Sequence, residues 1–304
     1  MSRVRVRVPA TSANLGPGFD ALGLALALYN DVEVSLAAAT TLTIEGEGAA
    51  RLPRGDRNVV ARAIRLAYDE AGRASARWAV RCVNRIPSAR GLGSSAAAWV
   101  GGLVAGNVLL GSPFDRAALL RLAARAEGHP DNVAAAIYGG LTVVGGEGDG
   151  VVAVTLPVPS ELTWVALVPE VTSATAEARA VLPATISRAA AVFNIQHVAL
   201  LLASLQSGRL ETLSVALDDR LHQPYRRKLF PWMPAVVEAA RAAGALGCVL
   251  SGAGPSVLAV VLRPDQSQAV AAGMEKALAR ANVRGAARVL AVDTEGAVVV
   301  EQSA

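Results

Sequence analysis

The chain has 304 residues, of which 53% are hydrophobic and 18% are charged, a composition typical of a folded globular protein with one large domain or two ordinary ones. The formal net charge is +4, but the arginines are scattered and the densest basic cluster spans only residues 226–228. This distribution argues against a nucleic acid partner and favours small anionic ligands. The two cysteines lie far apart without metal-ligand spacing, and the first residues lack the apolar core of a signal peptide, so we expect a reduced, cytoplasmic protein.

The uncharged segment 91–114 is long enough to imitate a membrane span. It opens on a polar turn and is rich in Gly and Ser, unlike a membrane span. We therefore predict no membrane partner, and instead a helix from about 94 to 110 that is apolar on all sides and buried in a core.

Hydrophobic periodicity predicts strands and helices in both parts of the chain. The predicted strands are 4–8, 31–36, 41–45, 77–83, 140–144, 163–168, 248–250, 257–262, and two near 287–292 and 296–300. The predicted helices are 58–70, 94–110, 115–126, 133–138, 174–182, 187–206, 209–218, 234–243 and 265–281. Between the first strand and an apolar run at 21–28, the Pro and Gly residues of PATSANLGPGFD predict a shaped loop without regular structure.

The segment 145–160 shifts to Gly and Pro, so we place a domain boundary there, with domains at 1–155 and 156–304. Strands and helices in both parts do not alternate as regular βαβ units. This pattern predicts two α+β domains.

The stretch RIPSARGLGSSAA, residues 85–97, has the composition of a phosphate-binding loop but contains no lysine. A P-loop requires that lysine, a dinucleotide fold requires a second strand about 20 residues later, and a protein kinase requires HRD and DFG motifs. None of these is present. The remaining phosphate-binding interpretation is that backbone N–H groups at a helix N-terminus hold the phosphates, while the plainer one is a serine helix cap preceded by glycines.

Three separated motifs resemble those of the GHMP kinases, a family named for galactokinase, homoserine kinase, mevalonate kinase and phosphomevalonate kinase. They are PATSANLGPGFDALGLAL near the N-terminus, PSARGLGSSAA in the middle and SGAGPS at 251–256. EGHPDNVAAAIYGG and ATAEARAVLP are similar to the homoserine kinase branch in particular. The resemblance implies a two-domain α+β GHMP kinase fold, with an N-terminal domain like ribosomal protein S5 domain 2 and a ferredoxin-like C-terminal domain.

The resemblance also implies the substrates and cofactors. It predicts transfer of a phosphoryl group from ATP to the alcohol group of L-homoserine, a step of threonine biosynthesis, with Mg²⁺ as cofactor and a homodimer as the assembly. Two open alternatives are another small-molecule kinase of the family and a GHMP-fold ligand sensor without catalysis.

Residue by residue, the resemblance assigns Mg²⁺ to Ser95 and Glu127 and adenine to Asn58. The nucleotide loop comprises Pro87, Ser88, Ala89, Arg90, Gly91, Leu92, Gly93, Ser94, Ser95, Ala96 and Ala97. The plainer interpretation of Glu127 is a solvated helix end.

The resemblance implies that homoserine binds to Asn14, Asp20, His129, Asn132, Arg179 and Arg226. It also implies that the catalytic residues are Asn132, Thr175 and Arg179. An α-amino acid needs a cation for its carboxylate and an acid or carbonyl for its ammonium, and this set offers both. Surface salt bridges are the plainer interpretation of the arginines. Where other branches of the family use an aspartate and a lysine, this chain has Asn132 at the place of the aspartate and no lysine available beside it, so we expect catalysis by positioning and Mg²⁺.

Overall fold

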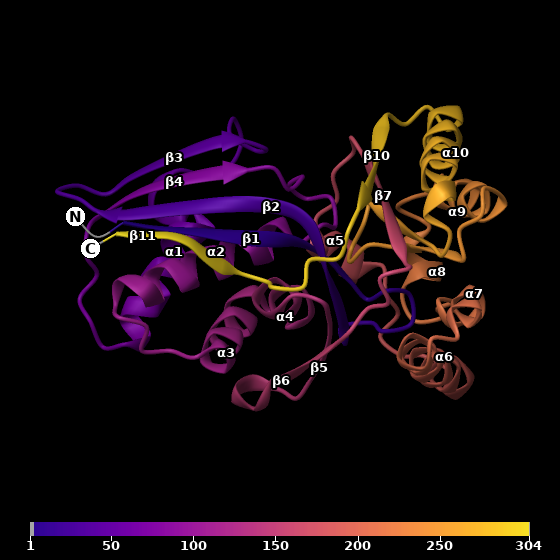
Figure 1. Ribbon diagram of the computed structural model, residues 1–304, viewed down its shortest axis with the longest axis horizontal. Helices are drawn as coiled ribbons and strands as arrows, with labels where there is room; N and C mark the ends of the chain where they lie inside the picture. Colours follow the sequence, from indigo (N-terminus) through magenta and orange to yellow (C-terminus); the bar gives the residue numbers. More distant parts are fainter. Residues whose placement is uncertain (1–2, 304) are drawn as a thin grey trace.

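A seven-stranded sheet forms the core of the first part of the computed structural model, which describes residues 3–303 (Figure 1). Its strand order is β11-β1-β2-β4-β3, and β5 pairs with both β2 and β6. Only β3 and β4 run parallel among these pairs. The strands are β1 (Arg3–Ala13), β2 (Leu22–Leu36), β3 (Thr41–Gly46), β4 (Trp78–Asn84), β5 (Leu141–Gly145), β6 (Val152–Leu156) and β11 (Val298–Ser303).

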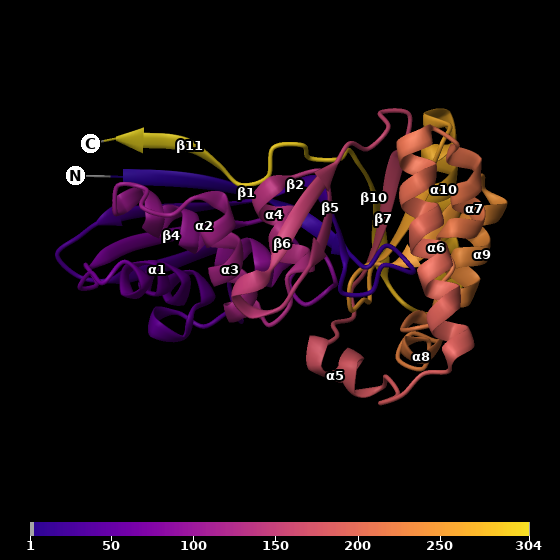
Figure 2. The same cartoon turned by 90° about the horizontal axis from the view of Figure 1, so that it is seen from below.

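Four helices cover one face of this sheet (Figure 2). They are α1 (Val59–Glu70), α2 (Ser94–Leu109), α3 (Arg116–Glu127) and α4 (Asp131–Tyr138). The predicted buried helix is confirmed as α2, which lies between the sheet and α1. Gly102 and Gly106 leave no room for a Cβ against Ala63 and Ala67 of α1, so these small residues let the two helices approach closely.

A second, four-stranded antiparallel sheet forms the core of the C-terminal part, in the order β10-β7-β9-β8. Its strands are β7 (Thr163–Pro169), β8 (Gly247–Leu250), β9 (Val257–Val261) and β10 (Gly285–Leu290). Val165 and Leu167 pack with α9 (Met233–Ala242) and α10 (Ser267–Arg280), whereas Trp164 and Ala166 join the core that includes residues of α6 (Arg188–Ser207) and α7 (Leu213–Ala216). Burial on both faces explains the nearly continuous apolar run of β7.

Shorter helices complete the chain. Two lie near the junction of the parts: α5 (Thr175–Ala180) and α8 (Gln223–Arg226). Single 3-10 turns occur at Gly55–Arg57, Gly148–Gly150, Leu210–Thr212 and Pro264–Gln266.

The expectation that 9–20 lacks regular structure is wrong for its first half. Strand β1 continues through Pro9 to Ala13, and the pairing with β2 shifts register between Pro9 and Ala10. A proline is tolerated at such an irregularity because no regular ladder bond is required of its nitrogen. The apolar run at 21–28 and the strand at 31–36 are likewise one strand, β2.

The last strand returns to the first sheet. β11 pairs antiparallel with β1, so residues 298–303 leave the C-terminal part and close the edge of the N-terminal sheet. The division near residue 155 remains our proposal for the domain boundary, with this crossing strand as an addition to it.

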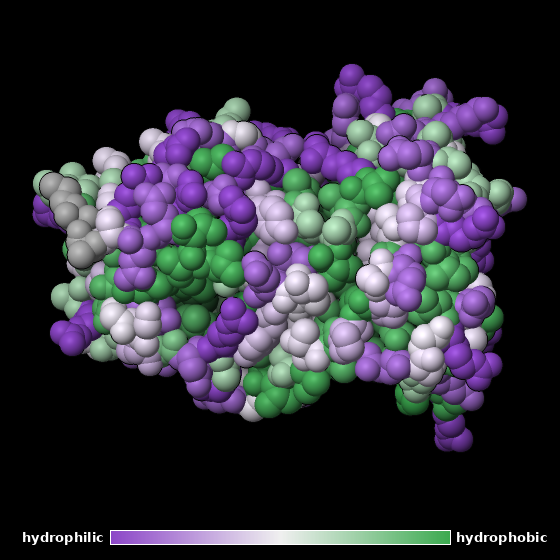
Figure 3. Space-filling view, in the orientation of Figure 1, coloured by the Kyte–Doolittle hydropathy of each residue, from purple (hydrophilic) through white to green (hydrophobic). Residues whose placement is uncertain are grey.

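Helix α6 is long and apolar enough to cross a membrane by length and composition alone, and 22% of its most apolar window is buried inside the protein. Val192 and Ile195 are exposed on it. On the face drawn in Figure 3, hydrophobic residues form separate patches between hydrophilic ones.

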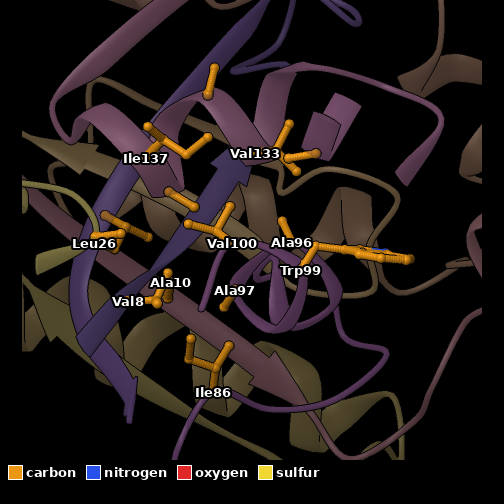
Figure 4. Close-up of a cluster of buried hydrophobic side chains, with 14 of the residues drawn as sticks. Val8, Ala10, Leu26, Ile86, Ala96, Ala97, Trp99, Val100, Val133 and Ile137 are labelled. Carbon is orange, nitrogen blue, oxygen red and sulfur yellow. The ribbon is translucent and has the colours of Figure 1, made fainter. Parts of the chain in front are cut away.

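The hydrophobic core fixes the start of α2 in space (Figure 4). Ala96, Ala97 and Val100 of this helix are fully buried in the same cluster as Val8 and Leu26 of the sheet. The loop before α2 is therefore attached to a rigid support.

Candidate active site

Two cavities meet at the N-terminus of α2. The smaller, about 100 Å³, lies where the two parts of the chain face each other, and the larger, about 480 Å³, lies beside β4 and α1. Residues at and just before the starts of α2 and α5 line both cavities: Ala89, Ser94, Ser95, Ser173 and Thr175. A group bound in one cavity can therefore reach a group bound in the other.

The glycine-rich loop presents backbone rather than side chains. Gly93 is the N-cap of α2 with φ 69° and no side-chain cap, so the first amides of the helix are left for another acceptor. An added Cβ at Gly93 would collide with the Thr11 side chain, and one at Gly91 with backbone oxygens of the 251–256 turn. Positive φ and close approach both require glycine here.

The second glycine turn, SGAGPS at 251–256, packs directly against this loop. Ser251 Oγ donates to Gly91 O at 2.6 Å, and Ser256 N donates to Arg90 O at 3.1 Å. The glycine turn of the C-terminal part thus holds the loop before α2 in place.

Ser95 and Glu127 lie side by side at the junction of the cavities. Ser95 Oγ donates to Glu127 Oε2 at 2.7 Å. Burial raises the pKa of Glu127. Glu127 is therefore not a freely solvated helix end; it is a half-buried carboxylate beside the loop.

The smaller cavity contains a buried cation without a carboxylate partner. Arg226 is 2% exposed, and its guanidinium donates to Ala178 O at 3.1 Å, Gly252 O at 3.0 Å and His222 Nδ1 at 3.1 Å, all neutral acceptors. Burial, with the charge of Arg179, lowers the pKa of Arg226 to about 10. Within residues 3–303 no carboxylate approaches it closely enough for a salt bridge, so an anion in this cavity would provide the missing partner.

Arg179 and Asp20 form a bidentate ion pair across the same cavity. Arg179 Nη1 and Nη2 lie 3.0 and 2.8 Å from the two Asp20 oxygens. Both side chains are about one third exposed, at 39% and 36%, so the pair is accessible. Cation and carboxylate thus stand next to each other, as recognition of an α-amino acid requires.

The remaining predicted acceptor residues also line the smaller cavity, and some of their polar atoms already have partners within the protein. Asn14 Nδ2 donates to Gly252 O and its Oδ1 accepts from Asp20 N, each at 3.0 Å. Asn132 Oδ1 accepts from Thr11 Oγ1 at 2.7 Å. His129 Nδ1 lies 3.1 Å from Asp131 Oδ1, and this contact raises the pKa of His129.

Asn58 lines the larger cavity and is at the same time the N-cap of α1. Its Oδ1 accepts from Val60 N and its Nδ2 donates to Pro53 O, both at 2.9 Å. An adenine contact can use only the second amide hydrogen and the second lone pair.

Four predicted loop residues line neither cavity. Leu92, Ala96 and Ala97 belong to the hydrophobic core, and Pro87 is buried beside it. Ser88 lines the larger cavity and Arg90 the smaller one. Ser173 was not predicted from the sequence. It is 8% exposed, its Oγ has no hydrogen-bond partner among residues 3–303, and it lines both cavities. The only signal was its place just before the predicted helix at 174.

This fold, with a lysine-free glycine loop between two facing parts of the chain, defines a small-molecule kinase of the GHMP class. Two family models match: GHMP kinases N terminal domain over residues 58–140 and GHMP kinases C terminal over 201–280. At 18% identity, mevalonate kinase from L. major superposes with a TM-score of 0.69 over 94% of each chain, a likeness of fold alone.

The full-length relatives are more specific. Homoserine kinase of Moorella thermoacetica is 45% identical over 97% of this chain and 99% of its own, and that of Trichormus variabilis is 44% identical over 98% and 99%. The crystal structure of homoserine kinase from Cytophaga hutchinsonii superposes with a TM-score of 0.90 at 32% identity, covering 98% of this chain and 97% of its own. The chain belongs to the homoserine kinase family of GHMP kinases.

Proposed function

We propose that this enzyme transfers the γ-phosphoryl group of ATP to the side-chain hydroxyl of L-homoserine, giving O-phospho-L-homoserine and ADP. The observation that carries the substrate assignment is the buried guanidinium of Arg226, which has no carboxylate partner within residues 3–303, beside the Arg179–Asp20 pair. The homoserine carboxylate would bind the two arginines and its ammonium Asp20. Asn14, His129 and Asn132 would complete the acceptor site. The hydroxyl would then have to face the junction of the cavities, because the phosphoryl group would be held there.

ATP would occupy the larger cavity, with its phosphates on the amides that begin α2. Four unpaired amides and the positive end of the helix dipole compensate phosphate charge without a lysine. Asn58 would border the adenine, and Thr175 would lie beside the transferred phosphoryl group.

Ser95 Oγ and Glu127 Oε2 have the chemistry that Mg²⁺ requires, since this ion prefers oxygen ligands and usually combines one or two protein groups with substrate phosphates. Among residues 3–303 there is no cluster of three His, Cys, Asp or Glu side chains that could hold a metal ion. When bound, Mg²⁺ would neutralise phosphate charge.

Catalysis would rest on positioning. Each carboxylate of the smaller cavity already has a partner: Asp20 has Arg179, Asp131 has His129 and Glu127 has Ser95. Asn132 cannot accept a proton at neutral pH. During transfer the bond from the hydroxyl oxygen to the γ-phosphorus forms, the bond to the departing ADP oxygen breaks, and the hydroxyl proton leaves with phosphate oxygen or solvent.

The homodimer implied by the family resemblance is also part of this proposal. The exposed apolar side chains of α6, Val192 at 44% and Ile195 at 65%, are compatible with contact to a second copy. The mass in solution, measured by light scattering, tests the assembly.

A coupled ADP-release assay across homoserine, mevalonate, galactose and shikimate tests the activity. We expect ADP release with homoserine and with none of the other three acceptors. Turnover with another acceptor would instead support a different GHMP kinase, and ligand binding without ADP release would support a sensor.

A further inference from the structure

A buried histidine lies directly behind Arg226. His222 is fully buried, and its Nδ1 is 3.1 Å from Arg226 Nη1 while its Nε2 is 2.8 Å from Gly16 O. A guanidinium can only donate, so Nδ1 must accept. The ring proton therefore resides on Nε2, from which it donates to Gly16 O.

Asp219 fixes the backbone that carries this histidine. Its side chain is fully buried and accepts from the backbone amides of Leu221, His222 and Gln223 at 2.7, 3.1 and 2.7 Å. These contacts organise the start of α8, the short helix that ends on Arg226. The carboxylate also lies 3.5 Å from His222 Nε2.

The same group of residues holds the loop that carries Asp20. Asn194 of α6 donates through Nδ2 to both Pro17 O and Asp219 Oδ1, at 3.0 and 2.8 Å. Phe19 stacks on the His222 ring with 5.2 Å between centroids, and the Arg226 guanidinium lies 5.3 Å from the Phe19 ring. The two sides of the acceptor site, Arg226 and Asp20, are thus connected through His222.

We propose that His222, anchored by Asp219, is a positioning residue for homoserine recognition. By accepting from Nη1 through Nδ1, it fixes the plane of the Arg226 guanidinium together with Gly252 O, the second acceptor of Nη1. Nε is held by Ala178 O, so the Nη2 edge is left to face the cavity. The inference rests on the proposed function, because it assigns His222 to the affinity for the amino-acid carboxylate. The competing interpretation is a core histidine that only stabilises the fold.

Two substitutions distinguish the role of Nδ1 from that of Nε2 in the His222 ring. In His222→Asn, the amide oxygen reaches the place of Nδ1 and can still accept from Arg226. In His222→Gln, the amide nitrogen reaches the place of Nε2 and can still donate to Gly16 O, but Nη1 of Arg226 loses one of its two acceptors and keeps only Gly252 O. Asp219→Asn is compared with Asp218→Asn, the adjacent exposed carboxylate that pairs with Arg241.

Steady-state kinetics with homoserine and ATP varied separately test the proposal. We expect His222→Gln and Asp219→Asn to raise KM for homoserine about 10-fold or more, while KM for ATP and kcat change little. We expect Asp218→Asn to stay close to wild type, and His222→Asn to keep a lower KM for homoserine than His222→Gln because it retains the acceptor for Arg226. Equal losses in His222→Asn and His222→Gln that follow the loss of thermal stability, or a normal homoserine KM in folded His222→Gln, would overturn it. Absence of homoserine phosphorylation by the wild type would instead refute the proposed function.

A measurement on the wild-type protein tests the proposal even if the variants fail to fold. The chain has three histidines, so nitrogen-15 NMR of the imidazoles can assign His222. We expect the Nε2–H tautomer, with an Nδ1 resonance that shifts on addition of homoserine and not of ATP alone. An Nδ1–H tautomer, or an Nδ1 resonance that does not shift on addition of homoserine, would overturn the proposal.

Discussion

Arg179 reaches across the acceptor cavity to hold Asp20 in a two-point ion pair, at 2.8 and 3.0 Å. Arg179 belongs to α5 in the C-terminal part, whereas Asp20 belongs to the loop between β1 and β2. The pair therefore joins the two parts of the chain at the place where a zwitterionic substrate would bind. A bound amino acid can replace half of each contact, giving its carboxylate to Arg179 and its ammonium to Asp20.

Arg179→Ala and Asp20→Asn should each reduce kcat/KM for homoserine about 10–100-fold. A charge-assisted hydrogen bond contributes roughly 1.5–3 kcal/mol, and a tenfold change in kcat/KM corresponds to about 1.4 kcal/mol. KM for ATP should change little, because the nucleotide would be held on α2. Arg284→Ala, which removes an exposed pair to Glu170, is the matched control. A loss confined to the ATP dependence would show that Arg179 serves the phosphates instead.

Glu127→Gln should lower kcat by orders of magnitude with an unchanged circular dichroism spectrum. The amide can keep the hydrogen bond with Ser95 Oγ but is a poor ligand for Mg²⁺, so the fold remains while the metal is held weakly. Activity is measured as a function of Mg²⁺ concentration, and the midpoint should move to higher concentration. Glu70→Gln, at an exposed pair with Arg125, should behave as wild type; near-normal turnover of Glu127→Gln would remove Glu127 from the site.

Gly93→Ala should abolish or strongly weaken ATP binding measured by calorimetry. Gly111 provides a control, because both glycines have positive φ, 69° and 84°, but a Cβ at Gly111 meets open space while one at Gly93 meets Thr11. Both substitutions carry a backbone strain of about 1 kcal/mol, so only the local clash differs between them. Ordinary ATP affinity in a folded Gly93→Ala protein would contradict the backbone cradle.

Much of the candidate site was predictable because its residues lie in segments whose wording resembles a known family. The smaller cavity collects Asn14 and Asp20 from the first motif and Glu127 and His129 from EGHPDNVAAAIYGG. The helix α2 was predictable because a long segment that is apolar on all sides favours burial in a core. The continuation of β1 through Pro9 was not, since a register shift depends on the partner strand. Ser173 and His222 were not predicted either, because their roles come from contacts with segments distant in the sequence.

The pH dependence of stability should show the buried state of His222. Burial, reinforced by the positive charge of Arg226, lowers the pKa of His222, although Asp219 and the more distant Asp20 oppose the shift. In the unfolded chain the imidazole has its ordinary pKa of about 6.5. As pH falls below that value, the unfolded chain takes up a proton that the folded chain refuses, so the free energy of unfolding decreases until the lowered folded pKa is reached.

The test compares wild type with His222→Asn, which cannot titrate at this position. Above about pH 6.5 the difference in unfolding free energy between the two proteins should be constant. Below it, the wild type should lose stability relative to the variant by up to about 1.4 kcal/mol per pH unit, the limit for one proton. Chemical denaturation at several pH values from neutral to acid measures this difference. Parallel curves throughout would mean that the folded protein binds the proton as readily as the unfolded chain, and that His222 does not hold the neutral form on which its contact with Arg226 depends.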